Sequence, residues 1–215
     1  GSRLLVHEKI YEKFVKRLVE VASEAKIGDP MSLDTHVGPV TTQPQFDKIM
    51  NYINIAKSEG AKCILGGNAY SSKNIKGNRF VEPTIFTDVK NNMRIAQEEV
   101  FGPVTCIYIY EDKEFDKTLK LVDETSPYAL TGAIFASEQV AIDKAMNALE
   151  YSAGNFYIND KPTGAVVGQQ PFGGCRASGT DDKAGSKLNL LRWVSPRLVS
   201  RTHNPPTSYP YDYMD

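Results

Sequence analysis

The most constraining feature of this sequence is an alternation of two kinds of segment between residues 104 and 158. Residues 104–110, 131–136 and 155–158 are short runs rich in β-branched and aromatic side chains, which favour strands. Residues 113–124 and 138–150 lie between them and have the length and apolar spacing of helices. Strands separated by helices of this length form right-handed crossovers in a mostly parallel sheet. We therefore expect an α/β fold, a mostly parallel open sheet with helices on both faces.

The first part of the chain adds two amphipathic helices to this prediction. Residues 7–26 carry apolar side chains at helical spacing, and Gly28-Asp29-Pro30 stops that helix. Thr42-Gln43-Pro44-Gln45 resembles a capping box with Pro in the first turn, so we expect a second helix that ends at Gly60.

Short extended segments are expected after these helices. Residues 63–65 read as a strand, and residues 68–78 are polar and read as a surface loop. Residues 80–89 read as an extended segment that Pro83 interrupts, so an unbroken central strand is not expected there. The end of the chain, residues 204–215, has the composition of an extended arm or of a frayed terminus.

Composition excludes several classes of function. The 215 residues are 41% apolar, enough for a sizeable core, and the formal net charge is −1 with acidic and basic residues interspersed. This charge balance does not favour nucleic-acid or charged-membrane partners. No apolar run approaches the roughly 20 residues of a membrane-spanning helix. No signal or transit segment is recognisable, although Gly1-Ser2 suggests that the natural start lies upstream.

The cysteines and histidines do not indicate a metal site. The three cysteines are far apart and odd in number, as expected in a reduced compartment, and no histidine lies at ligand spacing. Cys63 and Cys106 lie in apolar strands, where burial raises a thiol pKa and leaves it unreactive. Cys175 lies in a glycine-rich segment and is the best candidate nucleophile on local context alone.

That glycine-rich segment, residues 154–179, is the strongest candidate for a functional site. A strand at residues 156–158 ends in Asn159-Asp160, and glycines then flank Phe172 in Pro171-Phe172-Gly173-Gly174. Glycine lets the backbone adopt positive φ and approach a ligand closely. An ordinary surface loop is the alternative, but an aromatic ring on a flexible loop has nothing to pack against. We interpret the segment as a binding loop beyond the carboxyl ends of parallel strands. It contains no G-x-G-x-x-G fingerprint, and we expect no nucleotide-phosphate site in this chain.

Two motifs resemble those of the aldehyde dehydrogenase superfamily. They are Glu-Glu-Val-Phe-Gly-Pro-Val at residues 98–104 and Pro-Phe-Gly-Gly-Cys-Arg-Ala-Ser-Gly at residues 171–179. Either is suggestive, and both in this order are strongly specific. The resemblance covers nearly the whole chain. Residues 154–161, 163–164, 167–172 and 191–193 look most like the branch that oxidises L-glutamate γ-semialdehyde, formed from Δ1-pyrroline-5-carboxylate in mitochondrial proline breakdown.

The resemblance implies an NAD-dependent oxidation of an aldehyde to a carboxylate through a cysteine thiohemiacetal. By this resemblance, Glu99 accepts hydrogen bonds from the nicotinamide ribose hydroxyls, and Phe101 packs beside the ribose and nicotinamide. A hydrogen bond to a charged acceptor contributes about 1.5–3 kcal/mol, and fixing the ribose aims the nicotinamide at the hydride donor. From the residues alone, Glu99 also reads as a solvated carboxylate of the acidic pair Glu98-Glu99.

The same resemblance assigns the substrate to Gly164, Ala165 and Phe172. Uncommitted backbone N–H groups in a loop can form an anion-binding nest. Gly164 and Ala165 are thus expected to bind the α-carboxylate of the semialdehyde, while Phe172 covers its aliphatic part. An ordinary turn glycine and a core aromatic are the plain alternatives for Gly164 and Phe172.

By the resemblance, the chain corresponds to part of an enzyme. The nucleophilic cysteine of the family lies just upstream of the segment that Ser2 to Val6 resemble, and Cys175 does not match it. The dinucleotide-binding half and the general-base glutamate are also expected outside these residues, so we expect no catalytic residue, no turnover and no tight NAD binding from this chain alone. Residues 1–187 are expected to be a partial catalytic domain, and residues 188–215 an oligomerisation segment with a tail. The parent is then a homodimer or higher homo-oligomer in the mitochondrial matrix that acts on a small molecule.

Two other functions are compatible with the sequence. One is an aldehyde dehydrogenase with a different acyl substrate. The other, from a different class, is a half-domain that self-associates or binds a partner without any chemistry.

Overall fold

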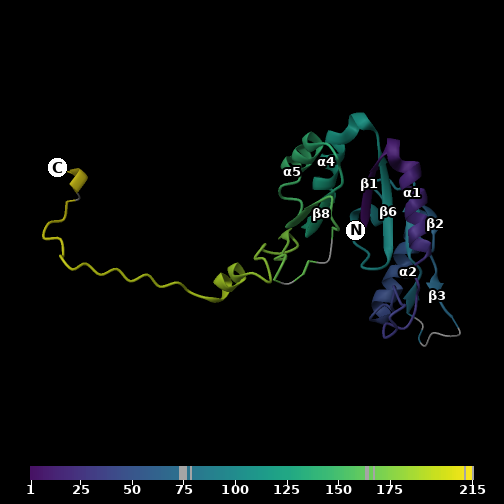
Figure 1. Ribbon diagram of the computed structural model, residues 1–215, viewed down its shortest axis with the longest axis horizontal. Helices are drawn as coiled ribbons and strands as arrows, with labels where there is room; N and C mark the ends of the chain where they lie inside the picture. The colour runs from purple at the N-terminus through teal and green to yellow at the C-terminus, as the bar shows by residue number, and fades with distance from the viewer. Residues whose placement is uncertain (73–76, 78, 163–164, 167, 211, 215) are drawn as a thin grey trace.

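The computed structural model describes residues 1–215 except 73–76, 78, 163–164, 167, 211 and 215. Its main sheet has the strand order β1-β6-β5-β2, in which β6 is parallel to both β1 and β5, and β2 is antiparallel to β5 (Figure 1). The strands and helices are β1 (Arg3–His7), α1 (Glu8–Ser23), α2 (Gln43–Ser58), β2 (Lys62–Leu65), β3 (Ala69–Tyr70), β4 (Phe80–Val81), β5 (Thr84–Thr87), α3 (Arg94–Gln97), β6 (Val104–Tyr110), α4 (Phe115–Glu124), β7 (Tyr128–Ala129), β8 (Thr131–Ile134), α5 (Gln139–Ala148), β9 (Asn155–Ile158) and β10 (Cys175–Arg176). The 3₁₀ helices are η1 (Asp112–Glu114), η2 (Lys187–Trp193) and η3 (Asp212–Met214).

Helices cover both faces of the main sheet because successive strand residues point to opposite sides. In β6, Cys106 belongs to the buried cluster that contains Ile49 and Ile53 of α2. The next residue, Ile107, belongs to the cluster on which α1 packs through Leu18. The expected parallel strands with helices on both faces are thus confirmed.

A second group of elements follows β6 in the chain. Strands β8 and β9 are parallel and paired from Thr131↔Asn155 to Ile134↔Ile158. Leu119 of α4 and Ala145 of α5 form a buried cluster, against which Phe156 of β9 packs. A two-stranded sheet is marginal without such cover. Among the described residues these two strands form a separate sheet rather than a continuation of the main one.

Local predictions are confirmed at most positions and wrong at a few. Thr42 caps α2 as the capping pattern predicts, with its Oγ1 accepting from the Gln45 N–H at 3.4 Å. Pro83 separates β4 from β5 as expected. Residues 68–78 are not entirely loop, because β3 pairs antiparallel with β4. Helix α3 was not predicted, since four residues are too few to show a helical period.

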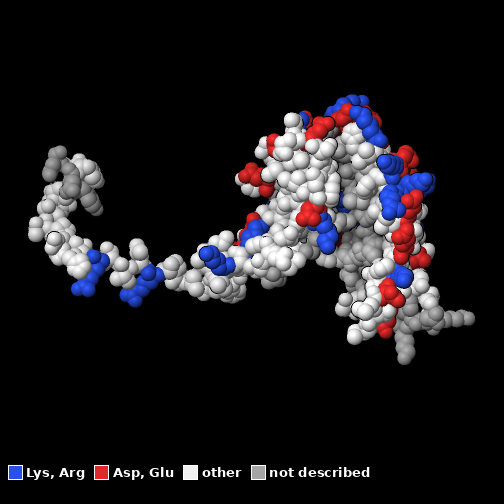
Figure 2. Space-filling view, viewed as in Figure 1, with Lys and Arg blue, Asp and Glu red and all other residues white. Residues whose placement is uncertain are grey.

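The chain ends in an exposed extension. Helix η2 carries exposed apolar side chains, with Trp193 79% and Leu191 67% exposed, and residues 194–210 extend away from the other elements (Figure 1). Figure 2 shows acidic and basic side chains interspersed over α1. No helix in the described part of the chain is both long and apolar enough to cross a membrane.

Candidate functional site

The segment 98–102, predicted to contact the cofactor, is fixed against α2. Val100 is buried, and Gln45 Nε2 donates to the carbonyl oxygens of Val100 and Phe101, each at 2.9 Å. Gly102 lies so close to α2 that an added Cβ would stand 2.6 Å from Ile49 Cδ1. Glycine is therefore required at this contact, and α2 sets the position of the whole segment.

Phe101 is held in an unusual conformation with its ring in solvent. Its φ is 57°, in the left-handed region that bulky residues rarely adopt. Its side chain is 68% exposed, with Lys48 Nζ 5.6 Å from the ring centroid. Such strain costs on the order of 1–3 kcal/mol and is concentrated at functional sites. The exposed ring contrasts with the buried Val100 beside it, so the core does not require Phe101 in this position.

The two neighbouring carboxylates of this segment have different environments. Glu98 Oε1 accepts from Arg94 Nε at 2.8 Å, and Glu98 Oε2 accepts from Arg94 Nη2 at 2.9 Å and from the Tyr52 hydroxyl. These hydrogen bonds, with Arg94 contributing most, lower the pKa of Glu98 to about 2. Glu99 is exposed, and no side chain in the described ranges bonds its carboxylate. Of these two carboxylates, that of Glu99 has the greater capacity to accept hydrogen bonds from a ligand.

Phe172 lies in a short strand-like stretch of the glycine-rich segment. Its N–H donates to the Ala184 carbonyl at 2.9 Å, and the Ala184 N–H donates to the Phe172 carbonyl at 2.7 Å. The Phe172 side chain is half-buried. The backbone of this residue is therefore rigidly held, as a ring that contacts a ligand requires.

The other predicted substrate residues lie before this stretch. Ala165 is half-buried in irregular backbone, and no acceptor for its N–H is found within the described residues. Gly164 lies outside the described residues. An uncommitted Ala165 N–H is compatible with binding an anion.

The predicted cofactor and substrate residues belong to different groups of elements. Glu99 and Phe101 lie beside α2, whereas Ala165 and Phe172 follow β9 in the group that contains α4 and α5 (Figure 1). No hydrogen bond, ion pair or ring contact joins the two pairs within the described parts of the chain. That they face one cleft stays a prediction.

None of the three cysteines is an activated nucleophile. Burial raises the pKa of Cys106 to about 11 and also raises the pKa of Cys175. Cys63 is half-buried, and its thiol donates to the Leu65 carbonyl at 3.3 Å. A raised pKa lowers the thiolate fraction at neutral pH. Cys175 is therefore a poor substitute for the nucleophile expected upstream.

Sequence reasoning missed the residues that hold these segments in place. Gln45 bonds a carbonyl 55 residues away, and the carboxamide of Asn155 contacts the backbone on both sides of Phe172. Neither pairing leaves a local pattern, because each depends on the tertiary fold.

The sequence is similar to known proteins over nearly its whole length. The sequence model of the aldehyde dehydrogenase family matches residues 1–198. A mitochondrial Δ1-pyrroline-5-carboxylate dehydrogenase from Dictyostelium discoideum is 49% identical over 214 residues, which are 99% of this chain and 38% of that protein. The chain therefore spans about 38% of the length of this relative.

Solved structures show the same likeness. The Thermus 1-pyrroline-5-carboxylate dehydrogenase with bound NAD is 36% identical, with a TM-score of 0.78 over 89% of this chain and 35% of that one. A betaine aldehyde dehydrogenase from Staphylococcus aureus is 32% identical, with a TM-score of 0.84 over 99% of this chain and 41% of that one. Enzymes named for different aldehydes thus share this fold.

Proposed function

Because the chain belongs to the aldehyde dehydrogenase family, we propose that it is part of an NAD-dependent enzyme that oxidises L-glutamate γ-semialdehyde to L-glutamate in proline catabolism. The observation that carries the substrate assignment is the Phe172 main chain, bonded to Ala184 in both directions, together with an Ala165 N–H for which no acceptor is found among the residues that the structure describes. Relatives named for Δ1-pyrroline-5-carboxylate support it.

The reaction would use residues inside and outside this chain. A cysteine thiolate from the remainder of the enzyme adds to the aldehyde carbon, and the thiohemiacetal loses a hydride to become a thioester, which water hydrolyses to the carboxylate. NAD, when bound, accepts that hydride. Glu99 would receive hydrogen bonds from the ribose hydroxyls of NAD, and Phe101 would pack beside the ribose and nicotinamide. The exposed Glu99 carboxylate, which has no side-chain partner within the described ranges, and the strained, exposed Phe101 support these roles.

The substrate would be recognised at both ends of its carbon chain. The backbone N–H groups of Gly164 and Ala165 would bind the α-carboxylate, and the Phe172 ring would cover the methylene groups. Covering two methylenes is worth about 0.8 kcal/mol each, while the N–H groups select for the charged end. An aldehyde without a carboxylate would lose the second contribution.

Assembly would depend on the end of the chain. We assign residues 1–187 to a partial catalytic domain, and residues 188–215 to an oligomerisation segment and tail that joins subunits of a homodimer or larger homo-oligomer. The exposed Trp193 and Leu191 support this assignment, because exposed apolar side chains in one segment favour an interface. The mitochondrial matrix is proposed as the location from the names of relatives such as the Dictyostelium protein.

Replacing Phe172 in the full-length enzyme tests the substrate assignment. The Phe172→Ala enzyme should show a KM for glutamate semialdehyde raised about tenfold, as the loss of about 1.5 kcal/mol of apolar contact predicts. The KM for propanal, which has no carboxylate and a shorter chain, should change much less. Equal changes in the two KM values would favour an aldehyde dehydrogenase with another acyl substrate.

The isolated chain offers a complementary measurement. It should neither reduce NAD with glutamate semialdehyde nor bind NAD tightly. Turnover by this chain alone would contradict the proposal and return Cys175 to consideration as nucleophile. An intact full-length protein that self-associates but shows no dehydrogenase activity would support a non-catalytic interaction module instead.

A further inference from the structure

We infer that Asn155 is the residue that positions Phe172, and thereby sets the affinity of the enzyme for its substrate. This inference rests on the proposed function, in which the Phe172 ring covers the substrate. Asn155 is the first residue of β9 and was expected from the sequence only as part of a strand.

The carboxamide of Asn155 bonds the backbone on both sides of Phe172. Its Nδ2 donates to the Pro171 carbonyl at 3.0 Å, and its Oδ1 accepts from the Gly173 N–H at 3.2 Å. In an extended chain the polar groups of residues before and after a given residue point to one side. Asn155 therefore satisfies one edge of the stretch 171–173 in the way that a neighbouring strand would.

The other edge of the same stretch is occupied by Ala184. Both hydrogen bonds there involve the N–H and carbonyl of Phe172 itself, at 2.9 and 2.7 Å. The main chain around the ring is thus bonded along both edges, and the Asn155 side chain supplies the partners of the two peptide groups next to Phe172. Without Asn155, the Pro171 carbonyl and the Gly173 N–H would lose these partners, and the stretch would keep its bonds to Ala184 and the bond from Lys183 Nζ to the Gly173 carbonyl at 3.2 Å.

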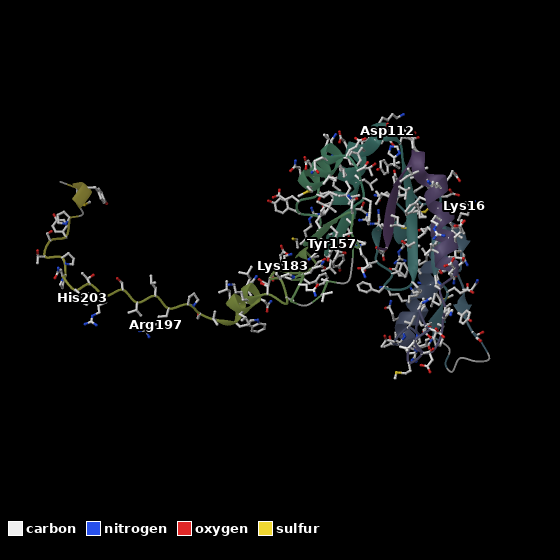
Figure 3. All side chains as sticks on the ribbon, in the orientation of Figure 1. Lys16, Asp112, Tyr157, Lys183, Arg197 and His203 are labelled. Atoms are coloured by element: carbon white, nitrogen blue, oxygen red, sulfur yellow. The ribbon has the colours of Figure 1, made fainter. Side chains whose placement is uncertain are left out.

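The main chain of Asn155 is held in place by the neighbouring strand β8 and the residue before it. Its N–H donates to the Leu130 carbonyl at 3.1 Å, and it pairs with Thr131 of β8. The preceding Gly154 is so close to the loop that an added Cβ would lie 1.9 Å from the Gly173 carbonyl oxygen. Lys183 Nζ, located where the chain leaves the group towards its tail (Figure 3), donates to the Gly154 carbonyl at 2.5 Å. The close approach of Gly154 to the loop brings the short Asn155 side chain within reach of the Pro171 carbonyl and the Gly173 N–H.

The chemistry of the side chain explains why asparagine is suited to this position. A carboxamide supplies one donor and one acceptor group at fixed spacing. Aspartate keeps the acceptor towards the Gly173 N–H but has no donor for the Pro171 carbonyl when ionised. Alanine lacks both groups, so the two variants separate the contributions of the two hydrogen bonds.

The test is a double-mutant cycle in the full-length enzyme with glutamate semialdehyde as the varied substrate. The Asn155→Ala enzyme should have a KM raised about tenfold, the expected effect of losing two neutral hydrogen bonds that fix the ring, with kcat changed far less. Asn155→Asp should lie between Asn155→Ala and the wild type. In the Phe172→Ala background, Asn155→Ala should raise KM no further, because the ring that Asn155 positions is absent. Hydrogen exchange at the Gly173 amide should be faster in Asn155→Ala.

Asn68→Ala provides the matched control. The Asn68 carboxamide bonds Glu82 Oε2 at 3.1 Å beside the β3–β4 pair and makes no bond to the 171–173 stretch. The KM of the Asn68→Ala enzyme for the semialdehyde should equal that of the wild type.

Two outcomes would show that the positioning role of Asn155 is wrong while the proposed function stands. In the first, Phe172→Ala raises KM but Asn155→Ala does not. In the second, the effects of the two substitutions on KM add in full. If Phe172→Ala leaves KM unchanged, the proposed substrate contact fails first, and with it the role of Asn155. Should Asn155→Ala not fold, the same comparisons are made with Asn155→Asp.

Discussion

The guanidinium group of Arg176 bonds both the main chain and the side chain of Asp123. Arg176 Nη1 donates to the Asp123 carbonyl at 2.7 Å, and Arg176 Nη2 donates to Asp123 Oδ1 at 2.5 Å. The same Oδ1 accepts from the Ser152 hydroxyl. This bond, and after it the contact with Arg176, lowers the pKa of Asp123, whereas partial burial opposes that shift. Three segments meet here: the end of α4, the turn before β9 and the glycine-rich loop.

Replacing Arg176 should loosen that loop and destabilise the fold. Arg176→Ala removes two charge-assisted hydrogen bonds from partners that are about two-thirds buried, and we expect a loss of about 1–2 kcal/mol in the free energy of unfolding. Arg17→Ala, which breaks an exposed pair with Glu20 on α1, serves as control and should cost less than about 0.5 kcal/mol. Denaturant unfolding of the full-length protein measures both. Equal costs would show that the Arg176 contact is no stronger than a surface pair.

Adjacent glutamates should respond differently to the same substitution. Glu99→Gln should weaken NAD binding about tenfold or more, since a hydrogen bond to a charged acceptor contributes about 1.5–3 kcal/mol. Glu98→Gln should leave NAD affinity nearly unchanged, because that side chain is bonded to Arg94 and Tyr52. Titration calorimetry with NAD on the two full-length variants measures both affinities. A larger effect at Glu98 than at Glu99 would reverse the assignment.

Acid should remove the contribution of Glu98 to stability. Its pKa falls from 4.5 to about 2 in the folded chain, chiefly through the Arg94 hydrogen bonds. A carboxyl with a depressed folded pKa stabilises the protein above its unfolded pKa and loses that effect as pH falls through the folded pKa. The stability difference between wild type and Glu98→Gln should therefore be constant well above pH 4.5 and shrink between pH 4.5 and about 2. A difference that stays flat through this range would contradict the ion pair.

Gly102 should tolerate no side chain. Because an added Cβ would stand 2.6 Å from Ile49 Cδ1, Gly102→Ala should cost about 1–3 kcal/mol, as overpacking of a well-packed contact does. At Gly38 the nearest atom to an added Cβ is Pro30 Cβ, at 3.7 Å, an ordinary contact. Gly38→Ala should thus be neutral or slightly stabilising. Thermal unfolding of the two variants measures these effects. A loss of stability at Gly102→Ala alone would show a packing requirement, whereas similar losses in both variants would show only a general preference for glycine.

Local patterns predicted most of the fold because they reflect short-range physics. The strand at 104–110 is β6 itself, and the capping pattern at Thr42 places the start of α2. Pro83 breaks the extended segment at the expected residue, since it cannot donate to a strand ladder. The separation of β8 and β9 from the main sheet was not predictable, because strand partners are chosen by long-range packing.

The candidate site was predictable only in part. Phe172 stood out through its neighbouring glycines and the family motif, Phe101 through the family motif alone, and the residues by themselves did not separate Glu99 from Glu98. The difference between the two carboxylates comes chiefly from Arg94, four residues before Glu98, and then from Tyr52, 46 residues away. The same holds for Asn155, whose partners lie in a loop with no periodic pattern.

We propose that Glu99 and Phe101 face Gly164, Ala165 and Phe172 across one cleft of the complete enzyme. The most direct measurement is a crystal structure of the full-length protein with NAD and L-glutamate, the proposed product. We expect the ribose hydroxyls to lie within hydrogen-bond distance of Glu99. We also expect the Phe172 ring to cover the methylene groups of glutamate, with the glutamate α-carboxylate bonded to the Ala165 N–H. NAD bound away from Glu99, or the two groups of residues on opposite faces of the protein, would contradict it.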